Sequence, residues 1–335
     1  MQLQRAAVPF IRNIWSPIDD WIIDTNNSTS TYYVVVGYKG KDTEITIPSS
    51  INNRSIYLSY EGISFLNSSN SASTGNAVTN VIVTDGIKGY SSGIDNSFAN
   101  MFKDTSILEV PNIPSNITNT YQTFMNCKSL SGSIPVLPDT ITNMFSMFEE
   151  CTGITNMVSA FPKNATSIGW AFYNCSSITG TIPEFPQNLT SMLSAFVECQ
   201  RLTGPIPTIP DTVTIMHQAF FNCKNLTGSI PKLPESATRI SNAFHNCAGL
   251  TDLSLPNFPN NVTNAYRCFY LLDTYGNCYV HSTEIINVKH CFRGSSAKNI
   301  YIHYTYENGT YTKTYNSFLA ANYFNGINGV TMYNF

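Results

Sequence analysis

Charged side chains are scarce in this sequence. Lys, Arg, Asp and Glu make up 12% of its 335 residues, about half of the ~25% that is usual in globular proteins. The 18 basic residues stand against 21 acidic ones, which gives a formal charge of −3. This leaves little positive charge for neutralising a nucleic-acid backbone. No run of residues approaches the ~18 apolar positions of a membrane-spanning helix. The sequence therefore predicts no nucleic-acid partner and no membrane span.

The first residues lack the features of a secretory leader. Only six residues separate Arg5 from Arg12, whereas a leader needs an apolar stretch of ~7–15 residues and small residues at a cleavage site. We expect either a mature form whose leader has been removed or a protein that reaches its destination by another route.

Motifs for catalysis and phosphate binding are missing as well. No GxGxxG or Walker sequence is present. His217 and His245 occupy non-equivalent positions, and no Ser or Asp recurs at a fixed distance from them, so a Ser–His–Asp or Cys–His arrangement is not predicted. Cys278-x-x-His281 and His290-Cys291 offer ligand types that zinc accepts, but at a spacing of no standard zinc module. We predict no enzyme activity, no cofactor and no metal.

Neutral polar and aromatic residues take the place of the missing charges. Asn, Ser and Thr number 37, 35 and 35 and together fill 107 positions. Aromatic residues reach 13% and hydrophobic residues 42%, whereas disordered chains have few aromatics and high charge. The composition predicts a folded protein with an uncharged polar surface.

A repeat dominates the middle of the chain. Six cysteines recur at intervals of 24 residues, and a phenylalanine lies three residues before each of them. A fixed period in this range is typical of solenoids, in which each unit buries its apolar face against its neighbours. We predict reduced, buried thiols, with disulfide bridging between stacked coils as the alternative. The predicted structural ladder consists of Phe124, Phe148, Phe172, Phe196, Phe220 and Phe244 with Cys127, Cys151, Cys175, Cys199, Cys223 and Cys247.

One unit shows the local pattern. From Val213 to Leu226 the apolar residues are spaced like one face of a short helical or 3-10 turn. Gly228 breaks this turn, and Leu226 to Pro231 forms a short extended segment that ends at the proline.

The two ends of the chain lack the period and predict β-rich caps. Val-, Ile- and Tyr-rich runs indicate strands at Trp21–Asp24, Tyr32–Tyr38, Glu44–Pro48, Ser55–Tyr60 and Asn80–Thr84. Near the other end, Glu307-Asn308-Gly309 predicts a hairpin between Asn299–Tyr306 and Thr310–Tyr315, followed by a short helix at Asn316–Tyr323 and a strand at Val330–Tyr333.

These observations predict a mainly β fold with short helical or 3-10 turns. Its centre is expected to be a solenoid of 24-residue units with β-rich N- and C-terminal caps. The expected domains are a cap or attachment domain over 1–93, the solenoid over 94–294 and a C-terminal cap over 295–335.

The repeat resembles a known family. Residues 243–250 read AFHNCAGL and are followed by Leu255-Pro256 and Val262-Thr263. This is similar to the BspA-type leucine-rich repeat, A-F-x-x-C-x-x-L, then I-x-I-P, then V-T-x-I. Residues 141–148, ITNMFSMF, are similar to a related repeat of bacterial surface lipoproteins, and residues 36–48 to the lead-in of BspA-like arrays.

A second likeness is weaker. Residues 225–231 read NLTGSIP and match the L-x-G-x-I-P run of plant-type repeats. The Ala-Phe-x-x-Cys block, however, stands where the plant unit carries its alternating strand, so the bacterial type is favoured. The resemblance covers about residues 30–294 and implies a curved solenoid used for adhesion or recognition, without catalysis.

The predicted function is recognition or attachment. The missing leader, the low charge and the richness in Asn, Ser, Thr and Tyr favour a phage virion component that binds a bacterial surface or a neighbouring virion protein. The alternative is a secreted or anchored BspA-like bacterial adhesin. Expected partners are virion or cell-surface proteins or a surface glycan, and self-association into a homo-oligomer stays open. Coil-to-coil variety predicts a partner-binding surface at Tyr121, Phe145, Trp170, Tyr173, His217, Phe221 and His245.

Overall fold

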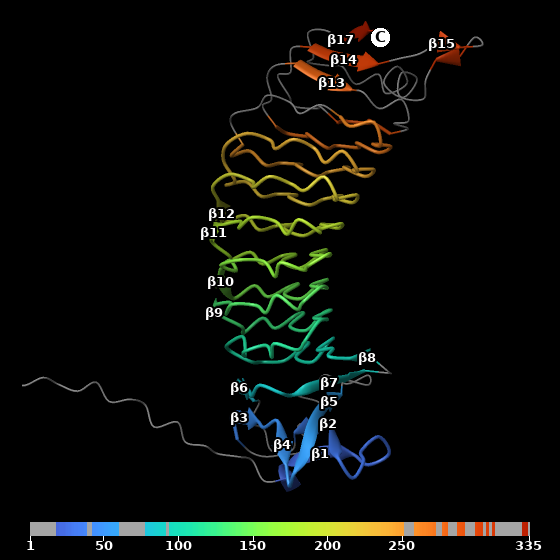
Figure 1. The fold of residues 1–335 in the computed structure, drawn as a ribbon. Helices are drawn as coiled ribbons and strands as arrows, with labels where there is room; N and C mark the ends of the chain where they lie inside the picture. Colours follow the sequence, from blue (N-terminus) through green and yellow to red (C-terminus); the bar gives the residue numbers. More distant parts are fainter. Residues whose placement is uncertain are drawn as a thin grey trace, which may run out of the picture.

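A long stack of coils forms the centre of the molecule, between a β-sheet near the N-terminus and a smaller sheet near the C-terminus (Figure 1). The computed structural model describes residues 18–38, 42–59, 78–91, 94–250, 258–272, 277–280, 287–291, 299–303, 306–307, 310–311 and 330–333. Within these residues the single helix is the 3-10 turn η1 (Ile18–Asp20), and no helix is long and apolar enough to cross a bilayer. The mainly β class is confirmed.

The N-terminal sheet has six strands in which parallel and antiparallel pairing are mixed. The order is β1-β2-β5-β7-β8, with β4 beside β5. A separate parallel pair joins β3 to β6. The predicted strands are confirmed within one or two residues, because their Val, Ile and Tyr side chains suit a half-buried pleated surface. Bounds are β1 (Trp21–Asp24), β2 (Tyr32–Tyr38), β3 (Glu44–Ile47), β4 (Ser50–Ile51), β5 (Arg54–Ser59), β6 (Asn80–Val83), β7 (Lys88–Ser91) and β8 (Ile94–Asp95).

Backbone hydrogen bonds join each coil to the next in parallel register. The amides of Thr120, Gln122 and Phe124 donate to carbonyls of the following coil, and each bond is 2.9 Å long. The amides between them donate within their own coil, as from Thr123 to the Thr120 carbonyl. A column of single β-bridges runs along the stack through Ser97, Asn119, Asn143, Ser167, Ser191, Ile215, Arg239, Asn264 and Asn287.

The predicted helical turn is wrong. The segment from Val213 to Leu226 forms a succession of tight turns. Every second backbone amide from Thr214 to Asn222 donates a hydrogen bond to a carbonyl of a neighbouring coil, so it is unavailable for a helix. Gln218 and Asn222 also have φ of 55° and 61°, and a right-handed helix has no place for such residues. The inward face was predicted correctly, because Met216 and Phe220 are fully buried.

A second set of short strands lies along another edge of the stack (Figure 1). β9 pairs with β10 and β11 with β12, both in parallel. β10 is one residue longer than the other three strands and carries a register shift. Bounds are β9 (Gly132–Ser133), β10 (Ile154–Asn156), β11 (Gly180–Thr181) and β12 (Leu202–Thr203).

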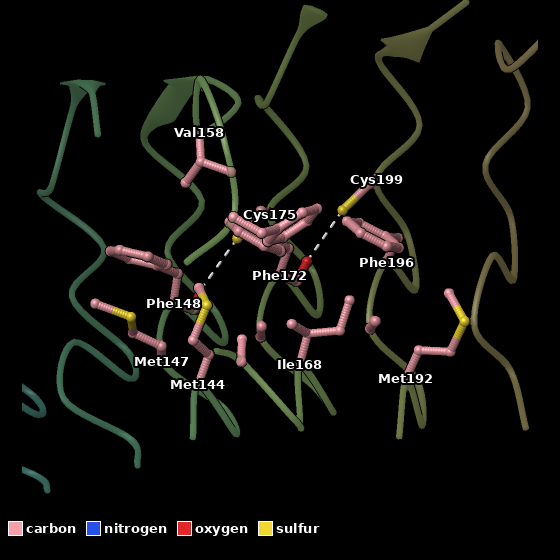
Figure 2. Packing of buried hydrophobic residues seen from close by; sticks show 14 of the residues in the cluster. Met144, Met147, Phe148, Val158, Ile168, Phe172, Cys175, Met192, Phe196 and Cys199 are labelled. Atoms are coloured by element: carbon pink, nitrogen blue, oxygen red, sulfur yellow. Dashed lines mark hydrogen bonds between the residues drawn. The ribbon is translucent and has the colours of Figure 1, made fainter. Parts of the chain in front are cut away.

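One apolar core runs from Trp21 to Cys291. Its axis is a column of stacked phenylalanines whose successive ring centroids lie 5.4–5.8 Å apart from Phe102 to Phe269. Figure 2 shows Phe148, Phe172 and Phe196 of this column, with Met144, Ile168 and Met192 along one side. Stacking of this kind adds to the burial of apolar area in holding the coils together.

Parallel pairing returns near the C-terminus. β13 (Asn277–Val280), β14 (Asn299–His303) and β17 (Val330–Tyr333) form a three-stranded parallel sheet. β15 (Tyr306–Glu307) pairs with β16 (Thr310–Tyr311) as an antiparallel hairpin. The hairpin is confirmed only at Tyr306–Glu307 and Thr310–Tyr311, whereas Asn299–His303 of its predicted first strand forms β14 of the parallel sheet instead. β17 has the predicted bounds. The predicted helix at 316–323 lies outside the described residues.

Candidate functional site

The cysteines of the repeat contribute to the core and offer no reactive group. Each of the six thiols donates to the phenylalanine carbonyl of the preceding coil, at 2.9–3.0 Å. Figure 2 shows two of these bonds, from Cys175 to Phe148 and from Cys199 to Phe172. Burial raises the pKa of Cys127 to about 11 and the pKa of Cys175 well above its ordinary value. The thiols therefore stay protonated and are poor nucleophiles and metal ligands.

The described part of the chain contains neither a disulfide bridge nor a cluster of metal-binding side chains. The eight cysteines whose side chains are described there are free and buried. The same residues contain no group of three His, Cys, Asp or Glu side chains that could hold a metal ion. His281 and the side chain of Cys278 lie outside the described residues.

His217 has a neighbour that the sequence did not indicate. Its Nδ1 lies 2.9 Å from the hydroxyl of Ser241, one coil further along. Burial and the nearby Arg239 lower the pKa of His217, which favours the neutral imidazole. No carboxylate is hydrogen-bonded to either nitrogen of this ring within the described residues. The pair lacks the acidic group that orients the base in a Ser–His–Asp site.

Four of the predicted partner-binding residues form two stacked pairs of rings, which together we call the first aromatic cluster. The rings of Tyr121 and Phe145 stack at 5.6 Å, and those of Trp170 and Tyr173 at 4.5 Å. Gly169 leaves room for Phe145, because a Cβ there would lie 3.0 Å from its ring. Trp170 has φ of 57°, an uncommon conformation for a bulky residue. Tyr121 is exposed and the other three side chains are half-buried.

Phe221 and His245 belong to a second aromatic cluster. The His245 ring lies between Phe221, at 4.5 Å, and Tyr270, at 4.7 Å. Burial and then the charge of Arg267 lower the pKa of His245 to about 4. Arg267 in turn lies 5.1 Å from the centre of the Tyr270 ring. With His245 only 9% exposed, this cluster contributes more to packing between coils than to an accessible surface.

Tyr270 and Arg267 were missed at the sequence level. The repeat shifts by one residue after Cys247, so that Phe269 follows Phe244 by 25 residues. This shift hid the alignment of Tyr270 with His245. The Phe269 register was the signal that could have revealed it.

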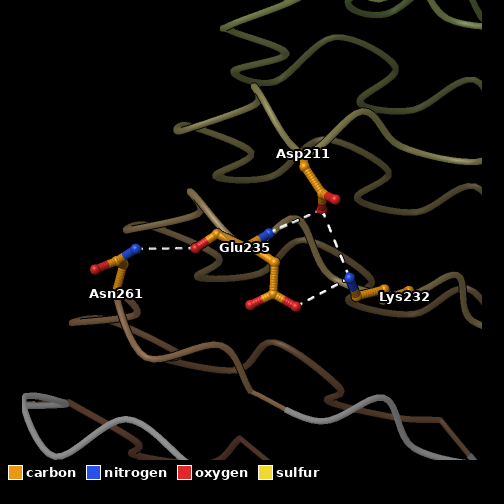
Figure 3. Close-up of polar contacts among 4 residues, drawn as sticks. All are labelled: Asp211, Lys232, Glu235 and Asn261. Carbon is orange, nitrogen blue, oxygen red and sulfur yellow. Dashed lines mark hydrogen bonds and ion pairs between the residues drawn. The ribbon is translucent and has the colours of Figure 1, made fainter.

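Ion pairs among the described residues are few and lie at exposed turns. Lys163 contacts Asp139 at 2.9 Å. Lys232 contacts Glu235 at 2.9 Å and Asp211 at 3.8 Å, as Figure 3 shows together with the bond from Asn261 to the Glu235 carbonyl. Exposed pairs of this kind contribute at most ~1 kcal/mol each. The contacts of Lys163 with Asp139 and of Lys232 with Asp211 join neighbouring coils, and the pairs do not converge on a charged site.

Comparisons with known proteins agree with this architecture. The sequence matches the family described as "BspA type Leucine rich repeat region" in six copies, over residues 120–227 and 193–317. No curated protein matches the chain. A solved leucine-rich repeat protein from Bacteroides ovatus shares 14% identity with a TM-score of 0.57, over 95% of this chain and 76% of its own.

A leucine-rich cell surface protein from Faecalibacterium prausnitzii is 15% identical, with a TM-score of 0.33 over 93% of this chain and 92% of its own. At 14% identity, the likeness to the Bacteroides ovatus protein concerns the fold alone. The family match covers more than half of the sequence, and the buried column from Phe124 and Cys127 to Phe269 lies within the matched residues. The chain belongs to the BspA-type leucine-rich repeat family.

Proposed function

We propose that this protein is a non-enzymatic recognition protein of a bacterial cell surface. Family membership supports this reading, since the repeat resembles those of bacterial surface proteins and such repeats typically carry no catalytic activity. The main expectation from the sequence, a phage virion component, gains no support from the comparisons, which favour its alternative, a BspA-like bacterial surface protein. On this proposal the partner is a cell-surface protein or a surface glycan.

The proposal rests on the difference between residues that repeat in every coil and are buried and residues that vary and stay accessible. Residues that repeat in every coil, such as Phe172 and Cys175, are fully buried. Among the residues that differ from coil to coil, those of the first aromatic cluster keep part of their rings accessible. Tyr and Trp are the side chains that most often dominate recognition surfaces. The stack thus acts as a rigid scaffold, and the outward rows provide specificity.

The same proposal takes the stack as a solenoid of 24-residue units over about residues 94–294. Hydrogen bonds between equivalent residues support it, for example from the Thr190 amide to the Thr166 carbonyl and from the Thr214 amide to the Thr190 carbonyl. The β-rich segments over 1–93 and 295–335 would then cover its two ends, which otherwise expose unpaired backbone groups.

Binding to cells tests the proposal. The fluorescently labelled chain is incubated with intact bacteria and with cultured epithelial cells, and retention is measured by flow cytometry. A variant with Tyr121→Ser, Phe145→Ser, Trp170→Ser and Tyr173→Asn should lose retention about tenfold or more, because it removes the aromatic anchors. The control is Val136→Thr, which changes a side chain that is 77% exposed in the same array.

Equal retention of the two variants would contradict the role of the first aromatic cluster. The virion alternative is tested separately by immunogold electron microscopy of the producing culture. Label on cell envelopes supports the proposal, whereas label confined to phage particles overturns it.

A further inference from the structure

One coil departs from its neighbours along the edge that carries β9 to β12. Residues 130–134, 178–182, 202–206 and 226–230 read LSGSI, ITGTI, LTGPI and LTGSI, and a proline follows each. The equivalent residues 154–159 read ITNMVS. Asn156, Met157 and Ser159 therefore replace the glycine, the next residue and the proline. The departure is confined to this edge, since Phe148 and Cys151 of the same coil keep their places in the column.

The backbone takes a different path at this coil. The four equivalent glycines have φ between 75° and 95°, a region that residues with a side chain seldom enter. Asn156 is instead an extended residue of β10. It pairs with Ser133 of the preceding coil and with Thr179 of the following coil as β-bridge partners. The Met157 amide then donates to the Thr179 carbonyl at 3.1 Å.

A hollow of about 370 Å³ lies between this coil and the next one. Pockets that bind small molecules measure about 300–1,000 Å³. Val158 forms part of the lining and is itself buried, and in Figure 2 it lies beside the phenylalanine column. Met157 and Pro183 supply apolar wall, and Asn156, Ser159 and Thr181 supply polar groups.

The polar groups of the hollow are uncharged and partly unused. Asn156 donates through Nδ2 to Ser133 at 2.9 Å, which leaves its Oδ1 open as an acceptor. The hydroxyls of Ser159 and Thr181 form no hydrogen bond with any described residue. The Thr179 hydroxyl cannot donate to a ligand, because it already donates to the Thr155 carbonyl at 2.7 Å. No Asp, Glu, Lys or Arg lines the hollow.

We propose that this hollow binds a neutral sugar residue. A charged ligand would find no counter-ion among the lining residues, and the volume is many times the ~30 Å³ of one water molecule, too large for a single ion. A pyranose presents hydroxyls that both donate and accept, which matches an amide oxygen and two free hydroxyls. It also presents an apolar C–H face, which matches Met157 and Pro183. None of these residues belongs to the two aromatic clusters, so the inference stands apart from the proposed partner surface.

The test measures binding of a panel of neutral sugars to the full chain. Methyl glycosides of glucose, galactose, mannose and N-acetylglucosamine are examined by saturation-transfer NMR and isothermal titration calorimetry. Glucuronate and N-acetylneuraminate serve as charged comparisons. At least one neutral glycoside should bind, and it should bind at least about tenfold more tightly than the charged sugars.

The repeat itself supplies a matched variant. Asn156→Gly, Met157→Ser and Ser159→Pro together give this coil the residues that Gly132, Ser133 and Pro135 provide in the preceding one. This variant should fold normally and lose sugar binding at least tenfold. Ser159→Ala and Thr181→Val keep the shape of the hollow but remove a hydroxyl, and each should weaken binding several-fold.

Three results would overturn the inference. They are failure of every neutral glycoside to bind the unmodified chain, unchanged binding by the triple variant, and preferential binding of the charged sugars. Cell retention through the first aromatic cluster is measured on different variants, so failure of one proposal leaves the other intact.

Discussion

The contact between a phenylalanine carbonyl and two cysteine groups recurs in the five coils from Phe124 to Phe220. The Phe148 carbonyl accepts the amide of Cys151 in its own coil at 3.1 Å and the thiol of Cys175 in the next coil at 3.0 Å. Cysteine suits this place because it is small, packs like an apolar residue and still supplies a weak donor. A carbonyl that would otherwise keep an unused lone pair in the core is thereby satisfied.

The buried thiols predict a loss of stability at high pH. A thiol in the unfolded chain ionises near pH 9, whereas burial raises the pKa of Cys127 to about 11 in the folded protein. Between these values the unfolded state releases a proton that the folded state keeps. The free energy of unfolding should therefore fall by about 1.4 kcal/mol per pH unit for each such thiol, and the full contribution is present below pH 9.

Urea denaturation between pH 8 and pH 11 measures this effect. Cys127→Ser removes one titrating group, so its stability should fall less steeply with pH than that of the unmodified protein. Parallel pH profiles for the two proteins would show that the thiol does not contribute in this way.

Among the structural elements, local sequence patterns predicted strands well and turns poorly. β1, β2 and β17 have the predicted bounds, because runs of Val, Ile, Tyr and Thr have few other ways to bury alternate side chains. The turn around Phe220 was predicted as helical, since its apolar spacing suits both a helix and a series of inward-facing turns. Hydrogen bonds to the next coil decide between them, and such bonds are invisible in a single unit.

The sequence likewise predicted some features of the candidate sites and missed others. The sequence register placed Tyr121 and Phe145 in one outward row, but the packing of Phe145 over Gly169 depends on three-dimensional fit. The Asn156–Ser159 hollow was overlooked, although a glycine replaced by asparagine in one coil was the available signal.

The phenylalanine column predicts a strong dependence on a single ring. Phe196 is fully buried and stacks at 5.7 Å on Phe172 and at 5.6 Å on Phe220. Phe196→Ala should lower the free energy of unfolding by about 3–5 kcal/mol, because it removes a buried side chain and leaves a cavity. Phe196→Leu keeps most of the volume and should cost less. Denaturant titration gives both values, and a loss below about 1 kcal/mol for the alanine variant would contradict the role of the column.

At the scale of the whole molecule, stability arises from repetition rather than charge. The described residues contain three ion-pair contacts, all at exposed turns, whereas the apolar core continues through every coil. Each coil therefore depends mainly on its two neighbours, as in other stacked repeat proteins. The sparse charge of the sequence fits this arrangement, since few positions need a charged partner.

Removal of one complete coil should leave a folded protein. Deleting residues 179–202 joins Ile178 to Thr203 and reproduces the junction between Leu202 and Thr203. The inter-coil hydrogen bonds then keep their register, so a cooperative unfolding transition is expected at somewhat lower denaturant concentration. Deleting only residues 179–190 places inward residues at outward positions and should prevent folding. Circular dichroism with urea titration compares the two, and folding of both would contradict a 24-residue unit.

The direction of the inter-coil hydrogen bonds has a mechanical consequence. Because those bonds run along the length of the stack, a pull on its two ends does not load all coils in shear. It strains the bonds at one end first, and each coil that peels away releases about two dozen residues of slack. A protein tethered between two moving bodies would then yield in small steps under tension and lengthen many-fold before its last coil gives way.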